Sequence, residues 1–212
     1  MFVTGTGTEV GKTVVAAVIA RTAREQNRRV SVFKPAVSGL DDSESPDHER
    51  LRLAADSQQT ADEIAPYRYG PPVSPHLAAD IAGEPIDADA LRKGLQRARE
   101  AGDFLVCEGV GGFLVPLRLD YLVRDFALDA GLPVVVVTSP GLGTINHTLL
   151  TIEAVRGAGL EVAGVVLTPW PAEPSAMERS NRETIERLGG VTVHVLKRID
   201  PDEPDSWPAL SP

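Results

Sequence analysis

The stretch VTGTGTEVGKTVV, at residues 3–15, restricts the possible folds of this chain more than any other feature of the sequence. Apolar residues lead into it and apolar residues at helical spacing follow it, so it predicts a glycine-rich turn from a strand into a helix. Backbone N–H groups in such a turn can surround an anion, and the positive end of the helix adds to the attraction. The usual phosphate-binding loop has four residues between its first glycine and Gly-Lys-Thr, whereas five separate Gly5 from Gly11.

The residues of Gly-Lys-Thr indicate which anion this loop holds. Lys12 can reach the β- and γ-phosphates of a nucleoside triphosphate, and the Thr13 hydroxyl can bind Mg²⁺. A dinucleotide-binding fingerprint is the alternative, because Gly5 and Gly7 have the spacing that it requires. That fingerprint needs an acidic residue at the end of the second strand, and Lys34 stands there. A simple strand-to-helix turn would leave Gly-Lys-Thr unexplained, so the sequence favours a nucleoside triphosphate.

Short apolar runs and helical patterns alternate along the chain. The near-continuous apolar character of the runs is typical of strands covered on both faces, and the alternation predicts a parallel sheet between helices. We therefore expect an α/β fold, a mostly parallel β-sheet flanked by helices, in a single P-loop NTPase-like domain over residues 1–212, with the tail after about residue 198 unassigned. The expected strands are residues 1–4, Val30–Phe33, Phe104–Cys107, Pro133–Thr138, Val162–Leu167 and Val191–Leu196. Three helices are expected. The first follows the loop, with Val14, Val15, Val18, Ile19 and Thr22 on one face, and the second spans residues 87–101, with Leu91, Leu95 and Ala98 on one face. The third begins near Thr144 and ends at Gly157 or Gly159.

Composition excludes several classes of function. The chain has 212 residues, 42% of them hydrophobic, which is enough for a full core. Its net charge of −9 disfavours a nucleic-acid surface, which needs a basic stripe. The single cysteine, Cys107, excludes a disulfide framework and is best explained by packing. No apolar run approaches the ~20 residues that span a bilayer, so we expect a soluble, cytoplasmic protein that binds neither nucleic acid nor membrane.

Ligands of parallel sheets bind beyond the carboxyl ends of the strands, so the residues at those ends are the candidates. Lys34 follows the second expected strand, either as a ligand contact or as a solvated cap. Glu108 follows the third, where a carboxylate is costly to bury without a partner. A shared Mg²⁺ would supply that partner, and a tight turn with an exposed glutamate is the alternative. Gly109, Gly111 and Gly112 then allow backbone N–H groups to converge on an anion.

A further candidate loop, SPGLGTINHT at residues 139–148, follows a strand as well. Its glycines and the helix expected from Thr144 form another potential anion site, with Asn146 and His147 in the first turn. For His147 a structural or capping role is favoured over catalysis. His76, in the stretch PVSPH, is either a loop ligand or a residue without a role.

Five motifs in this order, GTGTEVGKT, KPAVSG, SPH, EGVGG and GTINHTLLT, resemble dethiobiotin synthetases, and the resemblance runs from residue 2 to about residue 170. The loop of that family also carries the extra residue, as do those of the related amide-forming synthetases and ParA-like ATPases. The resemblance implies a homodimer with a seven-stranded α/β fold that uses 7,8-diaminononanoate, CO₂, Mg²⁺ and ATP or another nucleoside triphosphate. One amine captures CO₂ as a carbamate, whose oxygen attacks the γ-phosphate. The second amine then displaces phosphate from the carbamic-phosphoric anhydride and closes the ureido ring of dethiobiotin, in biotin biosynthesis.

The same resemblance assigns roles to individual residues. It makes Lys12 and Lys34 the catalytic residues, which stabilise carbamate and γ-phosphate charge together. It assigns Mg²⁺ to Thr13, Asp47 and Glu108, although Asp41, Asp42 and Glu44 are rivals of Asp47 in the same polar loop. It assigns the substrate to Thr8, Ser38, Gly111 and, across the dimer interface, Asn146. The nucleotide-binding set is Glu9, Val10, Gly11, Lys12, Thr13, Val14, Asp47, Glu108, Gly109, Val110, Gly111, Thr168 and Pro169.

Two segments depart from the pattern of the family. Family members often place an asparagine that reads adenine after the strand that ends here at Leu167, whereas this chain has Thr168 followed by Pro169. The C-terminal stretch LKRIDPDEP also matches poorly. Both departures leave the choice of base open, and neither affects the phosphate chemistry.

Two other families use a similar loop. A ParA- or MinD-like switch ATPase is the main alternative, but such proteins typically carry a second lysine early in the loop, where residues 6–8 provide none. They also need a membrane helix or a basic patch, which the acidic balance disfavours. A cobyrinate-type amide synthetase would usually need a glutaminase domain, for which 212 residues leave no room.

Overall fold

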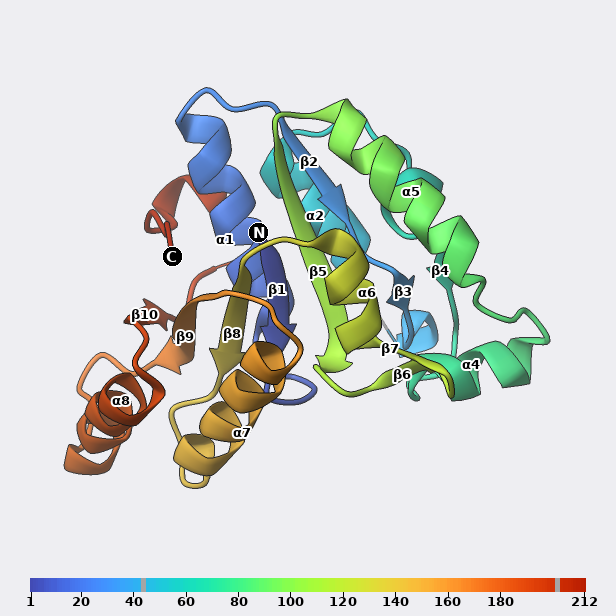
Figure 1. Ribbon diagram of the computed structural model, residues 1–212. Helices are drawn as coiled ribbons and strands as arrows, with labels where there is room; N and C mark the ends of the chain where they lie inside the picture. Colours follow the sequence, from blue (N-terminus) through green and yellow to red (C-terminus); the bar gives the residue numbers. More distant parts are fainter. Residues whose placement is uncertain (43–44, 201–202) are drawn as a thin grey trace.

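The computed structural model describes residues 1–42, 45–200 and 203–212, and a β-sheet lies at its centre (Figure 1). The six strands of this sheet lie in the order β10 (Val193–Lys197), β9 (Val162–Trp170), β8 (Val134–Thr138), β1 (Phe2–Gly5), β5 (Phe104–Gly112) and β2 (Val30–Phe33). Every pairing between them is parallel, which confirms the predicted α/β fold. Among the described residues this sheet has six strands and not the seven that the family resemblance implies. After β2 the chain leaves the sheet, and β3 (Ala36–Val37) pairs with β4 (Tyr67–Arg68) separately.

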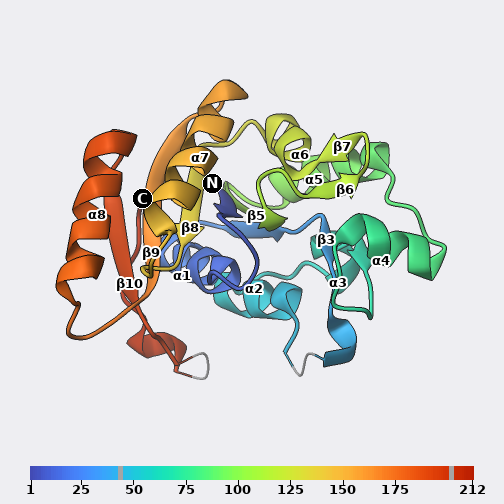
Figure 2. The ribbon, with the colours of Figure 1, turned by 90° about the horizontal axis from the view of Figure 1, so that it is seen from below.

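Helices cover both faces of the sheet, as Figure 2 shows. One face carries α1 (Lys12–Glu25), α2 (Asp47–Ala55) and α3 (Ala61–Ile64), and the other carries α5 (Ala88–Ala101), α6 (Val123–Ala130), α7 (Thr144–Gly157) and α8 (Ala176–Gly189). The remaining helix of the described residues, α4 (Pro75–Ala82), packs against the hairpin of β6 (Pro116–Arg118) and β7 (Tyr121–Leu122). None of the helices that the structure describes is both long and apolar enough to cross a membrane.

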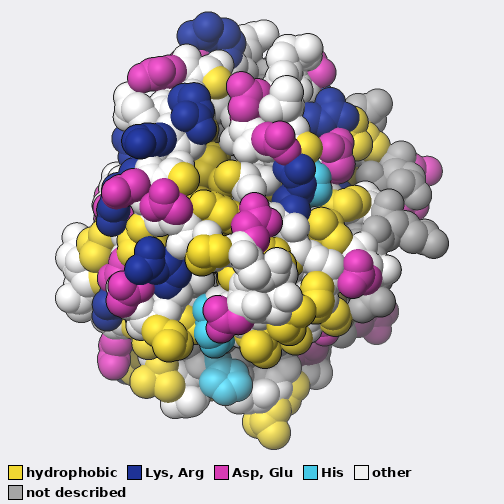
Figure 3. Space-filling model, turned by 90° about the vertical axis from the view of Figure 1, so that its right-hand side faces the viewer, with side chains coloured by type: hydrophobic (Ala, Val, Ile, Leu, Met, Phe, Trp, Pro, Cys, Tyr) yellow, Lys and Arg dark blue, Asp and Glu magenta, His cyan; other side chains and the backbone are white. Residues whose placement is uncertain are grey.

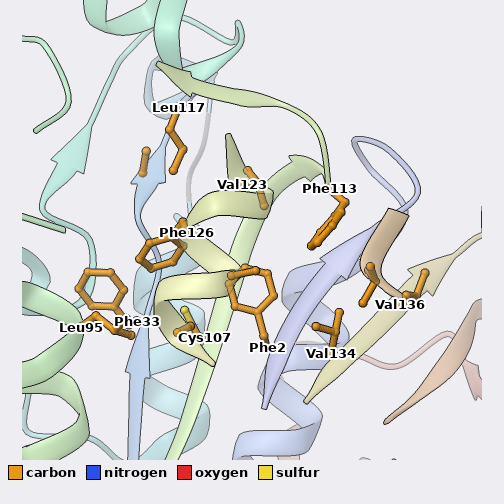
Figure 4. Close-up of a cluster of buried hydrophobic side chains, with 14 of the residues drawn as sticks. Phe2, Phe33, Leu95, Cys107, Phe113, Leu117, Val123, Phe126, Val134 and Val136 are labelled. Atoms are coloured by element: carbon orange, nitrogen blue, oxygen red, sulfur yellow. The ribbon is translucent and has the colours of Figure 1, made fainter. Parts of the chain in front are cut away.

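The side of the sheet under α5, α6 and α7 is held by aromatic packing (Figure 4). The ring of Phe126 lies 6.0 Å from that of Phe2 and 5.8 Å from that of Phe33, measured between centroids. Leu95 of α5 and Cys107 of β5 are buried in the same cluster. The interpretation of Cys107 as a packing residue is therefore confirmed.

Helix α1 is buried on more sides than its predicted face, because α2 and the C-terminal tail also cover it. Residues from Val15 to Ala23 are all buried. The hydroxyl of Thr22 accepts a hydrogen bond from the backbone N of Leu210 at 3.0 Å, and Arg21 donates to the carbonyl oxygen of Trp207 at 3.2 Å. The tail that the sequence left unassigned thus packs on α1.

Three of the differences between predicted and observed boundaries involve candidate site residues. The strand expected to end at Cys107 continues to Gly112, because Gly5 of β1 pairs with Gly112 beyond an irregularity. The strand expected to end at Leu167 continues to Trp170, which pairs with Lys197. The expected polar loop before Asp47 contains a 3₁₀ turn, Leu40–Asp42, and Asp47 itself begins α2. Glu108 and Thr168 therefore lie inside strands.

Candidate active site

The loop between β1 and α1 has a backbone that few residues could adopt. Glu9 and Gly11 have positive φ angles of 59° and 93°, in the left-handed region that favours glycine. A Cβ atom at Gly5 would lie 2.9 Å from the carbonyl oxygen of Gly7, so a larger residue does not fit. The Nζ atom of Lys12 donates to that same carbonyl at 2.9 Å. The extra residue is therefore accommodated in a closed loop, with the ammonium group folded over it.

Charged groups meet at the carboxyl ends of β2 and β5. Lys34, the residue after β2, is 3% exposed, and Glu108 in β5 is 0% exposed. The Nζ atom of Lys34 donates to Oε1 of Glu108 and lies 2.7 Å from Oδ2 of Asp47, at the start of α2. The Thr13 hydroxyl donates to the same Oε1 atom at 2.9 Å. Lys34 is therefore no solvated cap, and Glu108 is no exposed turn residue.

Burial and neighbouring charges shift the pKa of each ionisable group here. Burial raises the pKa of Glu108, and the opposite charge of Lys34 does not cancel this effect. Burial lowers the pKa of Lys34, but the two carboxylates outweigh it, so this pKa is raised. Burial raises the pKa of Asp47, but the charge and hydrogen bond of Lys34 outweigh it, so this pKa is lowered. Burial lowers the pKa of Lys12. The cluster thus favours a charged Lys34 and disfavours a charged Glu108 unless a further cation joins it.

One oxygen of Glu108 is left for such a cation. Its Oε2 atom is buried and has no hydrogen-bond partner among the described residues, which is costly for a carboxylate. No group of three or more His, Cys, Asp and Glu side chains within the described ranges could hold a metal by itself. Mg²⁺, however, is usually bound by one or two carboxylates with phosphate oxygens and water. The donor set of Thr13, Asp47 and Glu108 fits Mg²⁺ that is shared with a nucleotide.

A cleft of about 740 Å³ opens in front of these charged groups. Of the residues predicted from the sequence, it is lined by Thr8, Glu9, Gly11, Lys12, Thr13, Val14, Lys34, Ser38, Asp47, Glu108, Val110 and Gly111. Those predicted residues come from four segments of the chain, 8–14, 34–38, the start of α2 at Asp47, and 108–111, and the structure brings them around one space.

Five of the predicted residues do not line this cleft. Val10 packs against Gly5. A Cβ atom at Gly109 would lie 2.9 Å from Val123, so close packing explains this glycine. Asn146 is exposed on the first turn of α7. Thr168 is 3% exposed, behind the phosphate loop, where its Cγ2 atom approaches Gly11. Pro169, the next residue, is exposed.

His76, His147 and Asp41 do not line the cleft that holds the charged cluster. His76 stands on α4, and its Nδ1 atom is buried without a partner among the described residues. His147 is exposed on α7. Asp41 lies against Gly70. Glu44 and the side chain of Asp42 lie outside what the structure describes, so Asp47 is the described acidic residue of that segment that meets Lys34.

Sequence reasoning missed several residues that line the cleft. Arg50, one turn after Asp47 on α2, lines it beside the charged groups. Val37, Val73 and Val115 form an apolar part of the lining. An i, i+3 spacing from Asp47 to Arg50 would have indicated the arginine only if α2 had been predicted.

Comparisons with known proteins agree with this arrangement. A family model described as an AAA domain matches residues 1–208. The chain is 38% identical over 195 residues to the ATP-dependent dethiobiotin synthetase BioD of Bacillus subtilis subsp. natto, covering 91% of this chain and 84% of the relative. It is 41% identical over 191 residues to the protein of that name from Rhodococcus erythropolis, covering 89% and 83%.

A likeness to a solved structure concerns the fold alone. The septum site-determining protein MinD from Pyrococcus horikoshii, complexed with Mg-ADP, superposes with a TM-score of 0.56 at 17% identity, covering 94% of this chain and 82% of that one. The sheet and its flanking helices are therefore shared with a MinD-type ATPase, whereas the close sequence relatives are synthetases.

Proposed function

This chain belongs to the ATP-dependent dethiobiotin synthetase family, and on that premise we propose how its cleft closes the ureido ring of dethiobiotin. As a member of the family it is an ATP-dependent ligase that forms carbon–nitrogen bonds in biotin biosynthesis. The observation that carries the proposal is the buried cluster of Lys34, Glu108 and Asp47 beside the phosphate loop.

The substrate supplies the nucleophiles, so the protein must align groups and neutralise charge. One amine of 7,8-diaminononanoate takes up CO₂ as a carbamate, whose oxygen attacks the γ-phosphate. Lys34, held between two carboxylates, faces the place where both anions meet. Lys12 joins it by exchanging the Gly7 carbonyl for phosphate oxygens. The second amine then attacks the carbonyl carbon of the mixed anhydride, phosphate leaves, and the ring closes.

The metal ligands in this proposal are Thr13, Asp47 and Glu108. Support comes from the unpartnered Oε2 atom of Glu108 and from the hydroxyl of Thr13, which already lies 2.9 Å from that carboxylate. Mg²⁺ bound there would neutralise charge on the transferred phosphoryl group. Because Lys34 holds one oxygen of each carboxylate, it fixes the direction in which the remaining oxygens face.

The apolar lining of the cleft suits the aliphatic chain of the diamine. Val37, Val73 and Val115 line the same cleft as the charged cluster, and Gly111 lies against Val115. An alkyl chain on this wall would leave its two amines toward Lys34 and the phosphates. Arg50 adds a positive charge at the same end of the cleft.

A homodimer is the assembly that gives Asn146 a role. Its side chain is exposed and does not line the cleft of its own chain, so we place it at the substrate carboxylate of the neighbouring protomer. Nearby Leu142 is 93% exposed. Hydrophobic side chains also gather on the lower half of the face that carries α4 (Figure 3), where Leu77 and Ile81 are exposed. Light scattering should give twice the mass of the chain.

A cytoplasmic location and a single domain over residues 1–212 complete the proposal. The co-substrate is ATP or another nucleoside triphosphate. Thr168 stands where family members often place an asparagine that reads adenine, and it lies behind the loop with its methyl group toward Gly11. The relatives support the synthetase and not the switch ATPase, to which only the distant fold likeness points.

The deciding experiment is a complete assay with purified protein. Diaminononanoate, bicarbonate, Mg²⁺ and ATP should give phosphate and a cyclic urea in equal amounts, the urea identified by mass spectrometry. Omission of the diamine should abolish most phosphate release. A folded protein that hydrolyses ATP at the same rate with and without the diamine, and makes no urea, would be a switch ATPase instead.

A further inference from the structure

A chain of threonine hydroxyls runs from the phosphate loop to α7. Thr6 Oγ1 donates to Thr138 Oγ1 at 3.0 Å, Thr138 Oγ1 lies 2.9 Å from Thr144 Oγ1, and Thr144 Oγ1 lies 3.5 Å from Thr148 Oγ1. Thr138, Thr144 and Thr148 are at most 3% exposed. The four residues belong to three segments of the chain: the loop after β1, the last residue of β8, and the first two turns of α7.

Thr138 is the shared member of this chain of hydroxyls. A hydroxyl has one hydrogen to donate and can accept two hydrogen bonds. Thr6 donates its hydrogen to Thr138, whereas either oxygen can be the donor between Thr138 and Thr144 and between Thr144 and Thr148. Loss of the Thr138 hydroxyl would leave Thr6 without an acceptor and would take one hydrogen-bond partner from Thr144. Removal of a shared partner in a buried position costs more than the loss of one hydrogen bond.

Thr6 is anchored to β8 by both its backbone and its side chain, whereas the next residues of the loop have few contacts. Its backbone N donates to the carbonyl oxygen of Val137 at 3.0 Å, and its side chain is held by Thr138. Beyond it, a Cβ atom at Gly7 would touch nothing within 4 Å, and Thr8 and Glu9 are exposed. The position of the Gly7 carbonyl, on which Lys12 rests, therefore depends on how firmly Thr6 is anchored.

The other end of the hydroxyl chain is also fixed. The amide of Asn181, on α8 and 6% exposed, donates to the carbonyl oxygens of Pro140 and Gly141 at 3.0 and 3.3 Å. These residues form the loop that enters α7 at Thr144. The hydroxyl chain thus connects the phosphate loop to a helix start that is held from a third element.

We propose that Thr138 is a positioning residue for phosphoryl transfer, which holds the first turn of the phosphate loop through Thr6 and against the start of α7 through Thr144. The substrates named in this inference rest on the proposed function, whereas the role of Thr138 is argued from the hydrogen-bond geometry alone. Binding of a triphosphate is shared among many backbone N–H groups and tolerates a small displacement. In-line transfer does not, because a misplacement of about 1 Å can cost about 10²-fold in rate. The hydroxyl should therefore act on kcat more than on KM.

The test compares Thr138→Val, which keeps the shape and removes the hydroxyl, with Thr138→Ser, which keeps the hydroxyl. Thr4→Val is the matched control, because Thr4 is equally buried, lies two residues before Thr6, and has a hydroxyl without a partner among the described residues. We expect Thr138→Val to lower kcat about tenfold, with KM for ATP and for the diamine within about twofold, whereas Thr138→Ser and Thr4→Val stay near the wild type. The double variant Thr6→Val/Thr138→Val should lose no more kcat than Thr138→Val, since both remove one connection.

Several results would overturn the inference. One is a Thr138→Val enzyme that melts at a lower temperature but keeps its kcat, which would make the hydroxyl purely structural. Another is a kcat loss that Thr138→Ser does not restore. If Thr138→Val does not fold, Thr144→Val replaces it with the same expected kcat loss. A wild type without diamine-dependent phosphate release would reject the proposed function, and the same ratios measured on nucleotide hydrolysis in water would still decide the role of Thr138.

Discussion

Glu108→Gln should separate the role of the buried carboxylate as a hydrogen-bond acceptor from its proposed role as a Mg²⁺ ligand. The Oε1 atom of Glu108 accepts hydrogen bonds from Lys34 and Thr13, and the carbonyl oxygen of glutamine can accept both. The atom that changes is Oε2, which has no partner among the described residues and which becomes an NH₂ group. The substitution therefore keeps the local hydrogen bonds and removes the oxygen assigned to Mg²⁺.

The effect on stability should be modest. Breaking a buried ion pair by removal of one partner costs about 3–5 kcal/mol when the other charge is left alone. Here Lys34 keeps Asp47 at 2.7 Å, and the raised pKa of Glu108 shows that burial already penalises its charge. We expect a loss of about 1–2 kcal/mol, which lowers the melting temperature by about 2–8 °C for a chain of this size.

Turnover should fall much further, by about 10²-fold or more, because the lost group acts on charge in the transition state. The assay measures diamine-dependent phosphate release against Mg²⁺ concentration, together with thermal unfolding monitored by circular dichroism. Glu49→Gln is the control: Glu49 is on α2, two residues after Asp47, but its carboxylate pairs with Arg52 and does not line the cleft. Full turnover of Glu108→Gln at ordinary Mg²⁺ concentrations would refute the metal assignment, and an unfolded variant would show that the charge is needed for the fold.

Three further predictions follow from the same site. Lys12→Ala should lower turnover by roughly 10²-fold while circular dichroism stays unchanged, since Lys12 donates only to a loop carbonyl among the described residues; turnover within about threefold of the wild type would remove Lys12 from catalysis. The pKa of Asp47 is lowered in the folded state, so its contribution to stability is present above its unfolded pKa of about 4 and is lost as the pH falls below it. Urea midpoints between pH 6 and pH 3 should therefore decrease more for the wild type than for Asp47→Asn, and equal decreases would contradict the lowered pKa. CTP, GTP and UTP should support turnover within about two orders of magnitude of ATP in kcat/KM, because Thr168 offers no amide to the base; strict dependence on ATP would place the reading of the base elsewhere, for example in the C-terminal tail.

The pairing of Lys34 with Glu108 could almost be predicted from the sequence. Both residues were predicted at strand ends, and in a parallel sheet those ends share one edge. The missing step was the strand order. Once β2 lies beside β5, Phe33 is opposite Cys107, so the next residues, Lys34 and Glu108, come together by register alone. Sequence patterns rarely fix strand order, because every buried parallel strand is similarly apolar.

Asp47 could not be placed by the same reasoning. It begins α2, a helix of nine residues that lies between two segments without periodicity, and its sequence was interpreted as a polar loop. A helix this short is marginal by itself and gains its stability from packing. In α2 that packing is supplied by Leu51, which is 0% exposed and joins the cluster under α1. The signal for the helix is therefore in its tertiary contacts and not in its own composition.

The shared fold and the specific function differ in the same way, because the local sequence predicts the first far better than the second. The sheet and its flanking helices include the longest and most apolar segments of the sequence, and they are the fold that this chain has in common with a MinD-type ATPase at 17% identity. The wall that we propose for the diamine is built instead from short pieces: Val37 of the two-residue strand β3, Val73 just before α4, and Val115 just before β6. None of these pieces would be stable alone, so each adopts its structure because the sheet edge and the buried cluster beneath it are already in place. The segments that we propose to bind the diamine are thus the parts with the weakest local signal, and their identification requires the packed structure.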